Sequence, residues 1–280
     1  MPPDPVTTPP GPGRRRYSPF RSVIIVLCVI VALMVLVVGG LVAWTQLRPV
    51  NSSDYSKVGN DASALKDELT PIVTRQSQMM DLSLLPTPEQ VDRAAQAQRD
   101  QVATFRSDVV ELGKLHGMGD PELQQLQEQL LATTDDQLTP MVEDFVTHYA
   151  AVLRMHQVCT EYDKNAPTRP VDGADRAWFD DKIEQCEKAT EEAAKSTVFQ
   201  PFVEVRQQHI TDSRAGYQAY GEATTDEARL AAQSTIGRAQ NGIQTRGKEG
   251  LQQVVEANNA VFAEVEDGIT AITAYTDQHQ

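Results

Sequence analysis

Two cysteines carry the clearest candidate chemistry in this sequence of 280 residues. Cys159 and Cys186 are close enough along the chain for the segment 160–172 to bring their Cα atoms within the about 7 Å that a disulfide requires. In an oxidising compartment such a bond persists, and closing this loop would stabilise the fold by about 3.5 kcal/mol. We predict a Cys159–Cys186 disulfide; the alternative is two buried free thiols.

Histidines raise the possibility of a metal site. His148 and His156 lie eight residues apart, on one side of an expected helix, and Cys159 follows one turn later. A metal site made of these three residues is therefore conceivable. The sequence contains neither H-E-x-x-H nor E-x-x-H, the spacings that metalloproteases and di-iron bundles use. We therefore expect packing or surface histidines, with no metal and no cofactor.

Paired acids do not form a convincing catalytic centre. Asp135-Asp136, Asp180-Asp181 and Glu191-Glu192 are neighbours on expected helices, where adjacent side chains point about 100° apart. Carboxylates that act together must converge on one point, so these pairs are typical of solvated faces. The sequence also lacks a G-x-S-x-G elbow, a P-loop and a G-x-G-x-x-G turn. We expect no catalytic residue and no enzyme activity.

Trp178 and Phe179 are large aromatic residues that follow the Pro-containing segment Asp163–Gly173. Aromatic residues near a loop can anchor a partner, and they can equally close the end of a helical core. We favour the core.

The elements that must position these residues are helices. Start signals occur at Thr87-Pro88, Asp120-Pro121 and Thr224-Thr225, and no segment alternates apolar and polar residues as a strand would. Apolar residues instead recur every three or four positions. The expected helices are 61–80, 88–116, 121–163 with a break or kink at Pro140, 173–197, 201–222 and 225–278.

The short connections between these helices favour antiparallel packing. The predicted fold class is therefore all-α, an antiparallel helical bundle. Gly237, Gly242, Gly247 and Gly250 weaken the last helix, because each costs about 1 kcal/mol relative to Ala, and they could split it. The same apolar stripe also suits a coiled-coil pairing, so a homo-oligomer remains open.

An uncharged run, Ser22–Trp44, predicts a single N-terminal transmembrane helix. As a helix it would span roughly 34 Å, enough for a hydrocarbon core near 30 Å, and Tyr17 and Trp44 bracket it as interfacial aromatics do. A cleaved signal peptide is the first alternative, but the apolar run is too long and lacks an A-x-A-like site. A lipoprotein at Cys28 is the second, but Ile25-Val26-Leu27 are too large for such a site.

Basic residues set the expected orientation of the anchor. Arginines are concentrated before it, which places the N-terminus in the cytoplasm and the rest of the chain outside; they are Arg14, Arg15, Arg16 and Arg21. The tail is rich in proline and too short to bury a core. The expected organisation is a disordered Pro/Arg-rich cytoplasmic tail at 1–21, the anchor at 22–45, a linker at 46–60 and an extracytoplasmic helical domain at 61–280.

The outer region is strongly acidic. Residues 51–280 contain 20 basic and 38 acidic residues, a formal charge of −18. This charge repels phosphate backbones and excludes nucleic acid as a partner. Solubility explains the charge most simply, although a basic partner or calcium would also suit it; no EF-hand loop supports calcium.

These features favour a membrane-anchored extracytoplasmic interaction or scaffold protein of a bacterial cell envelope. Its expected partners are the lipid bilayer and an envelope or membrane protein, or further copies of the chain. The alternative is an extracytoplasmic ligand-binding or sensor bundle that signals through a membrane partner, because the short tail holds no signalling domain. A pocket between helices with convergent polar groups would favour this alternative.

Overall fold

The computed structural model describes residues 48–83, 86–166 and 173–280. Their regular structure is entirely helical, without a strand in these three ranges, which confirms the predicted all-α class. The chain divides into two compact units, Met1–Pro49 and Val50–Gln280. The second unit contains every helix considered below.

The expected membrane anchor falls outside the described residues. No helix in the described ranges combines the length and apolar character that a membrane crossing needs. The residues expected to form, orient or bracket the anchor all lie outside these ranges: Ser22–Trp44, Arg14, Arg15, Arg16, Arg21 and Tyr17. Their roles therefore stay predictions.

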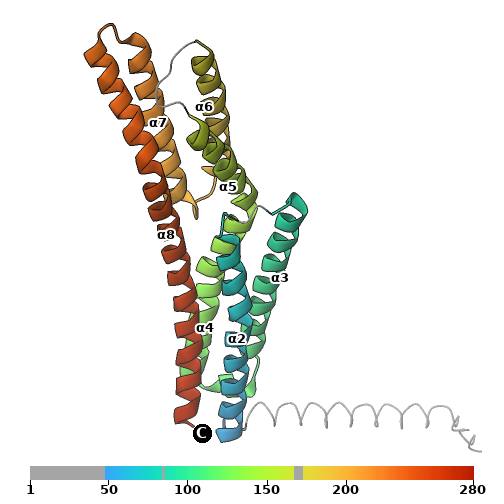
Figure 1. The fold of residues 1–280 in the computed structure, drawn as a ribbon. Helices are drawn as coiled ribbons and strands as arrows, with labels where there is room; N and C mark the ends of the chain where they lie inside the picture. Colours follow the sequence, from blue (N-terminus) through green and yellow to red (C-terminus); the bar gives the residue numbers. More distant parts are fainter. Residues whose placement is uncertain (1–47, 84–85, 167–172) are drawn as a thin grey trace, which may run out of the picture. The chain divides into compact units, whose positions relative to one another are not determined.

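Seven α-helices and two short helical turns make up the described part of the second unit (Figure 1). In chain order they are α2 (Ser52–Met79), α3 (Pro88–Leu112), η1 (His116–Gly119), α4 (Pro121–Thr133), η2 (Thr134–Leu138), α5 (Thr139–Asn165), α6 (Gly173–Ala193), α7 (Gln200–Glu222) and α8 (Asp226–Gln278). The expected helices therefore exist, although α3 and α6 end four residues earlier than the sequence indicated.

The first helix begins within the segment that we expected to be a linker. Asn51 caps α2: its Oδ1 accepts hydrogen bonds from the Ser53 and Asp54 amides at 3.0 and 3.3 Å, and its own amide donates to Asp54 at 3.1 Å. This reciprocal capping box starts the helix at Ser52. The linker prediction is consequently wrong for residues 52–60, where Val58 is fully buried.

The expected break before Pro140 is present. Thr134–Leu138 form one turn of π-helix, so α4 and α5 continue each other through a local irregularity. The Thr134 hydroxyl donates to the Leu130 carbonyl at 2.8 Å, and Pro140 lies in the first turn of α5. Proline has no amide hydrogen to donate, so an irregular turn before it is the expected arrangement.

The last helix does not split at its glycines. α8 is continuous over 53 residues. A Cβ atom at Gly250 would lie 2.9 Å from the Pro201 carbonyl oxygen and 3.1 Å from the Phe202 Cα atom. Glycine at this position thus allows α7 and α8 to approach closely, and the resulting packing offsets its low helix propensity.

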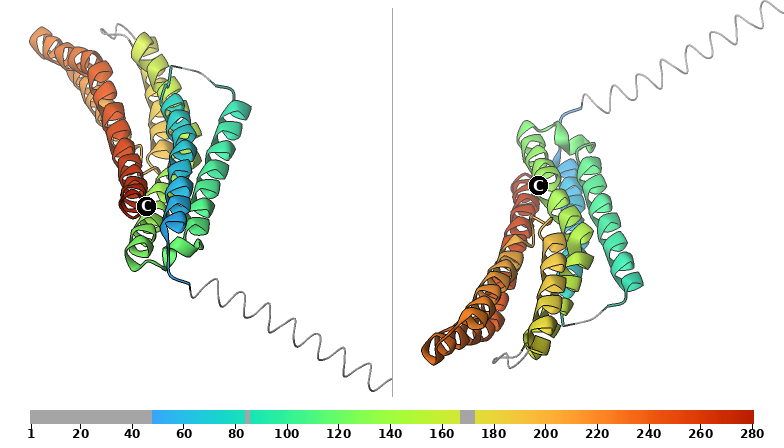
Figure 2. Two further views of the ribbon diagram at one scale, coloured as in Figure 1. Left: turned by 90° about the horizontal axis from the view of Figure 1, so that it is seen from below. Right: turned by 90° about the horizontal axis from the view of Figure 1, so that it is seen from above.

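α8 is the element that joins the two halves of the bundle. Its first half packs antiparallel to α7, with Ile236 against Gly216, and its second half packs against α2 and α4, with Thr276 against Gly59. α6 packs against α5 and α7. In both views of Figure 2, α2 lies between α3 and α8.

A small polar cluster holds the first and last helices together. Asp120 Oδ2 accepts hydrogen bonds from the Tyr55 hydroxyl at 2.7 Å and the Tyr275 hydroxyl at 3.0 Å. The His279 ring stacks on Tyr275, with centroids 4.2 Å apart. We call Tyr55, Asp120, Tyr275 and His279 the terminal clasp, because they place the C-terminus beside the start of α2 (Figure 1).

Candidate functional site

Cys159 and Cys186 form a disulfide, as predicted from the sequence. Cys159 of α5 and Cys186 of α6 are bonded, with Cα atoms 4.9 Å apart, and both are completely buried. The Thr190 hydroxyl donates a hydrogen bond to the Cys186 carbonyl at 2.7 Å, in the last turns of α6 and next to the disulfide. The disulfide therefore fixes α6 against the C-terminal turns of α5.

The structure separates the residues of the hypothetical metal site. Cys159 is bonded to Cys186 and has no thiolate to offer. The His156 ring is tilted by 40° against that of Phe202, with centroids 6.2 Å apart, whereas His148 lies near the carboxylate of Asp144. Across the described ranges, no group of three His, Cys, Asp or Glu side chains is placed to hold a metal.

The aromatic pair after the irregular segment belongs to the core. Phe179 is buried and stacks on Tyr217, with ring centroids 3.7 Å apart. Trp178 is partly buried and stacks on Tyr162 at 6.3 Å. The prediction that these residues close a core is confirmed.

Of the acid pairs, only one member makes a contact between helices. Asp135 forms a bidentate ion pair with Arg106 of α3, at 2.5 and 3.0 Å. Asp136, Asp180, Asp181, Glu191 and Glu192 are exposed, as expected for solvated faces. The pairs thus do not converge on a common point.

A buried ionic network that the sequence analysis missed joins α5 to α7. The Asp163 carboxylate accepts a hydrogen bond from Arg206 through one oxygen and contacts His209 Nε2 at 2.9 Å through the other. The side chain of His209 is fully buried, and that of Arg206 is 6% exposed. We call Asp163, Arg206 and His209 the ionic network.

Two opposing effects determine the charge state of Asp163. Burial alone would raise the pKa of its carboxyl group, but the hydrogen bond from His209 and the positive charge of Arg206 outweigh it. The net pKa of Asp163 therefore lies below its ordinary value, and the carboxylate is charged at neutral pH. Removing one partner would leave the other charges buried without compensation.

A cavity of about 420 Å³ lies beside this network, where α2 ends, α7 begins and α8 passes both. We call it the junction cavity. Its polar side is formed by α5 and α7 through His156, Thr160, Asp163, Lys164 and Arg206. A cavity of this size between helices is large enough for a small organic ligand.

Two buried nitrogens at the junction cavity have no hydrogen-bond partner among the described residues. They are Arg206 Nε and His156 Nδ1. A buried donor that stays unpaired costs about 1–3 kcal/mol, so such atoms are rare and require an explanation. Burial, followed by the charge of Arg206, lowers the pKa of His156, which keeps its ring neutral at neutral pH.

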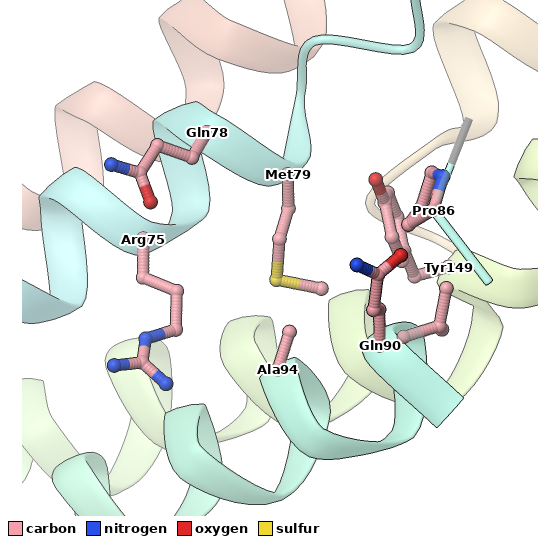
Figure 3. Close-up of a pocket in the computed structure, with 8 residues that line it drawn as sticks. Arg75, Gln78, Met79, Pro86, Gln90, Ala94 and Tyr149 are labelled. Carbon is pink, nitrogen blue, oxygen red and sulfur yellow. The ribbon is translucent and has the colours of Figure 1, made fainter. Parts of the chain in front are cut away.

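A second cavity, of about 340 Å³, opens between α2 and α3. We call it the α2–α3 cavity. Figure 3 shows the Met79 thioether between Arg75 on one side and Pro86 and Tyr149 on the other, above Ala94. Burial raises the pKa of Tyr149 to about 12, so its hydroxyl stays protonated. Arg75 is the only charged side chain in this lining.

Two carboxyl groups meet farther down the same pair of helices. Burial, together with a hydrogen bond and the charge of Asp108 on α3, raises the pKa of Glu68 on α2 to about 7. A pKa near 7 leaves the Glu68 carboxyl partly protonated at neutral pH, so that it can share a proton with the neighbouring carboxyl group. No sequence spacing marks it, because the two residues lie 40 positions apart on different helices.

Comparison of the chain with known protein families, with curated proteins and with solved structures gives no match. The geometry of the described residues is therefore the basis for the function proposed below.

Proposed function

We propose that this protein is a membrane-anchored extracytoplasmic helical module that binds a small ligand and acts through a membrane partner. The uncharged run Ser22–Trp44, with arginines before it, supports the anchor and its orientation. The acidic charge beyond residue 50 supports a solvent-facing outer domain without nucleic acid as a partner.

The junction cavity is the observation that carries the ligand-binding role. Ligand sites are typically largely apolar and contain a few polar groups that converge on the ligand. The junction cavity has this composition, with Phe202, Ile243 and Leu251 on its apolar side and unpartnered nitrogens on its polar side. An interaction scaffold would not require such a cavity.

A scaffold role is the second candidate, and one feature favours it. Leu230, near the start of α8, is 64% exposed and is the one large apolar side chain with such exposure in the described ranges. A single exposed leucine could contact a partner at this end of the bundle. It provides much less apolar surface than a permanent interface usually buries.

Topology is the first test of the proposal. Protease added to the outside of intact bacterial cells that make the full chain should digest the helical domain. A fragment containing the tail and anchor should remain, protected by the membrane and cytoplasm. Protection of the helical domain with loss of the tail would contradict the proposal.

Co-purification separates the two candidate roles. The full chain, extracted in mild detergent, should retain a small molecule that mass spectrometry detects after denaturation. A Leu230→Ser variant should retain it equally. A stoichiometric protein partner that is lost in the Leu230→Ser variant, with no small molecule present, would favour the scaffold role instead.

A further inference from the structure

The donors in the junction cavity indicate what kind of group its ligand must carry. Arg206 Nε can only donate a hydrogen bond, and the opposite edge of the same guanidinium already binds Asp163. His156 Nδ1 can donate when the ring is protonated or in the matching tautomer. Two neighbouring donors without acceptors favour a ligand with oxygen acceptors, such as a carboxylate.

The charges around the cavity favour an anion. Lys164, Arg206 and Lys248 line it, and the negative charge of Asp163 is already engaged by Arg206 and His209. Asp81 contributes the remaining formal negative charge. The cavity therefore carries more positive than negative formal charge, although residues 51–280 as a whole carry −18.

The opposite wall of the cavity is apolar and has room for part of a ligand. Phe202 of α7 and Ile243 and Leu251 of α8 form this wall. Between them lies Gly247, where an added Cβ atom would find its nearest neighbour, a Phe202 ring carbon, at 4.0 Å. Gly247 thus leaves open a volume that a side chain could occupy without a clash.

We infer that the junction cavity binds a small amphiphilic carboxylate. Arg206 and His156 bind its carboxylate, Lys164 and Lys248 add attraction at the cavity, and its apolar part packs on Phe202, Ile243 and Leu251. The inference depends on the ligand-binding role proposed above and names the chemical class of that ligand.

Binding can be measured with probes that share one apolar part. The full chain in lipid nanodiscs is titrated with 4-phenylbutyrate, 4-phenylbutan-1-ol or 4-phenylbutylamine by calorimetry and by ligand-observed NMR, with empty nanodiscs as the blank. We expect 4-phenylbutyrate to bind at least tenfold more tightly than the alcohol and the amine, because a hydrogen bond to a charged group contributes about 1.5–3 kcal/mol. Acetate, which lacks the apolar part, should also bind at least tenfold more weakly.

A matched pair of glycine variants locates the site. Gly247→Leu should abolish the binding of 4-phenylbutyrate, because its side chain occupies the cavity and removes no polar group. Gly237→Leu makes the same change ten residues earlier on α8, where an added Cβ atom meets nothing within 4 Å and no cavity lining is involved. The control variant Gly237→Leu should bind 4-phenylbutyrate with the same affinity as the natural chain.

A third variant tests the polar contact without disturbing the ionic network. His156→Phe keeps a ring beside Phe202 and removes the ring nitrogens. It should weaken the binding of 4-phenylbutyrate about tenfold. Equal binding of the amine and the carboxylate, unchanged affinity in Gly247→Leu, or no binding of 4-phenylbutyrate at millimolar concentration would each overturn the inference. Each of these results would leave the protease test of topology unaffected, so the two proposals fail separately.

Discussion

The two cavities of the bundle are similar in size and different in chemistry. The junction cavity has a volume of about 420 Å³ and the α2–α3 cavity about 340 Å³. The first lies against a buried ionic network with unpartnered nitrogens, and the second is lined by one charged side chain, Arg75, beside neutral groups. Volume alone does not identify a ligand site; buried polar groups that still need partners do.

Their positions in the bundle explain this difference. The α2–α3 cavity is lined by the end of α2, the start of α3 and Tyr149 of α5 (Figure 3). The junction cavity forms where segments far apart in the sequence meet, from Met80 through His156 and Arg206 to Leu251. The junction cavity thus receives Asp163, Lys164 and Arg206 from α5 and α7, whereas α5 contributes only the neutral Tyr149 to the described lining of the α2–α3 cavity.

The largest expected effect comes from breaking the ionic network. Asp163→Ala leaves Arg206 buried without its carboxylate, and loss of one member of a buried ion pair typically costs about 3–5 kcal/mol. Urea unfolding, followed by circular dichroism, should show this loss. Arg75→Ala, the matching removal of charge from the α2–α3 cavity, should cost about 0.5 kcal/mol or less. Equal losses of unfolding free energy in the two variants would show that the ionic network stabilises the fold no more than a surface charge does.

Removal of the disulfide should affect the two cavities unequally. The double variant Cys159→Ala/Cys186→Ala should lose about 3.5 kcal/mol of unfolding free energy. In hydrogen exchange the amides of α5 and α6 should show the largest acceleration, and those of α2 and α3 a smaller one. In the natural chain both thiols should resist alkylation until reduced. Free labelling before reduction would contradict the bond.

Low pH should remove the stabilisation that Asp163 contributes to the fold. It should also remove the destabilisation that arises when Glu68 of α2 is charged. The folded-state pKa of Asp163 is lowered, so its stabilisation is present above about pH 4 and is lost as the pH falls through the folded value. Glu68 has a folded pKa raised to about 7, so its stabilisation is complete at low pH and is lost as the pH rises through 7. Glu68→Gln should therefore stabilise the protein at pH 8 by about 1 kcal/mol, a value reduced for solvent screening, and have little effect at pH 5. An equal gain at both pH values would exclude a shared proton.

The smallest expected effect comes from replacing glycines of α8 with alanine. It separates the gain from burying a methyl group in the junction cavity from the gain in helix propensity. Gly247→Ala and Gly237→Ala should each gain up to about 1 kcal/mol from propensity. Gly247→Ala should gain slightly more, because its methyl group is also buried beside Phe202. Thermal unfolding of both variants measures the difference. A loss of stability in Gly247→Ala alone would mean that the cavity has no room for the methyl group.

Local signals in the sequence predicted most of the fold. Thr87, Asp120 and Thr225 cap the helices that they were expected to start, and the irregular turn precedes Pro140 as expected. The start of α2 was missed because residues 52–60 are mostly polar and provide few apolar positions. The Asn51–Asp54 capping box was the signal that could have identified it.

The candidate site was less accessible from sequence, because its contacts are long-range. Asp163 lies 43 residues from Arg206 and 46 from His209. No spacing rule pairs them until the packing of α5 on α7 is known. The disulfide was predictable because residues 51–280 contain only two cysteines, which leaves one possible pairing.

The continuity of α8 has a mechanical consequence. The helix is held at one end by the terminal clasp through Tyr275, lines the junction cavity near its middle at Gly247, and extends to Asp226 at the other end. A rigid helix that turned about the clasp at Tyr275 would move its far end about 1.7 times as far as Gly247, because Asp226 and Gly247 lie 49 and 28 residues from Tyr275. Ligand entry that displaces Gly247 by about one ångström would thus move Leu230 by about 1.6 Å. Spin-label distances between α3 and the start of α8, measured with and without ligand, would detect this movement, and unchanged distances would exclude a lever.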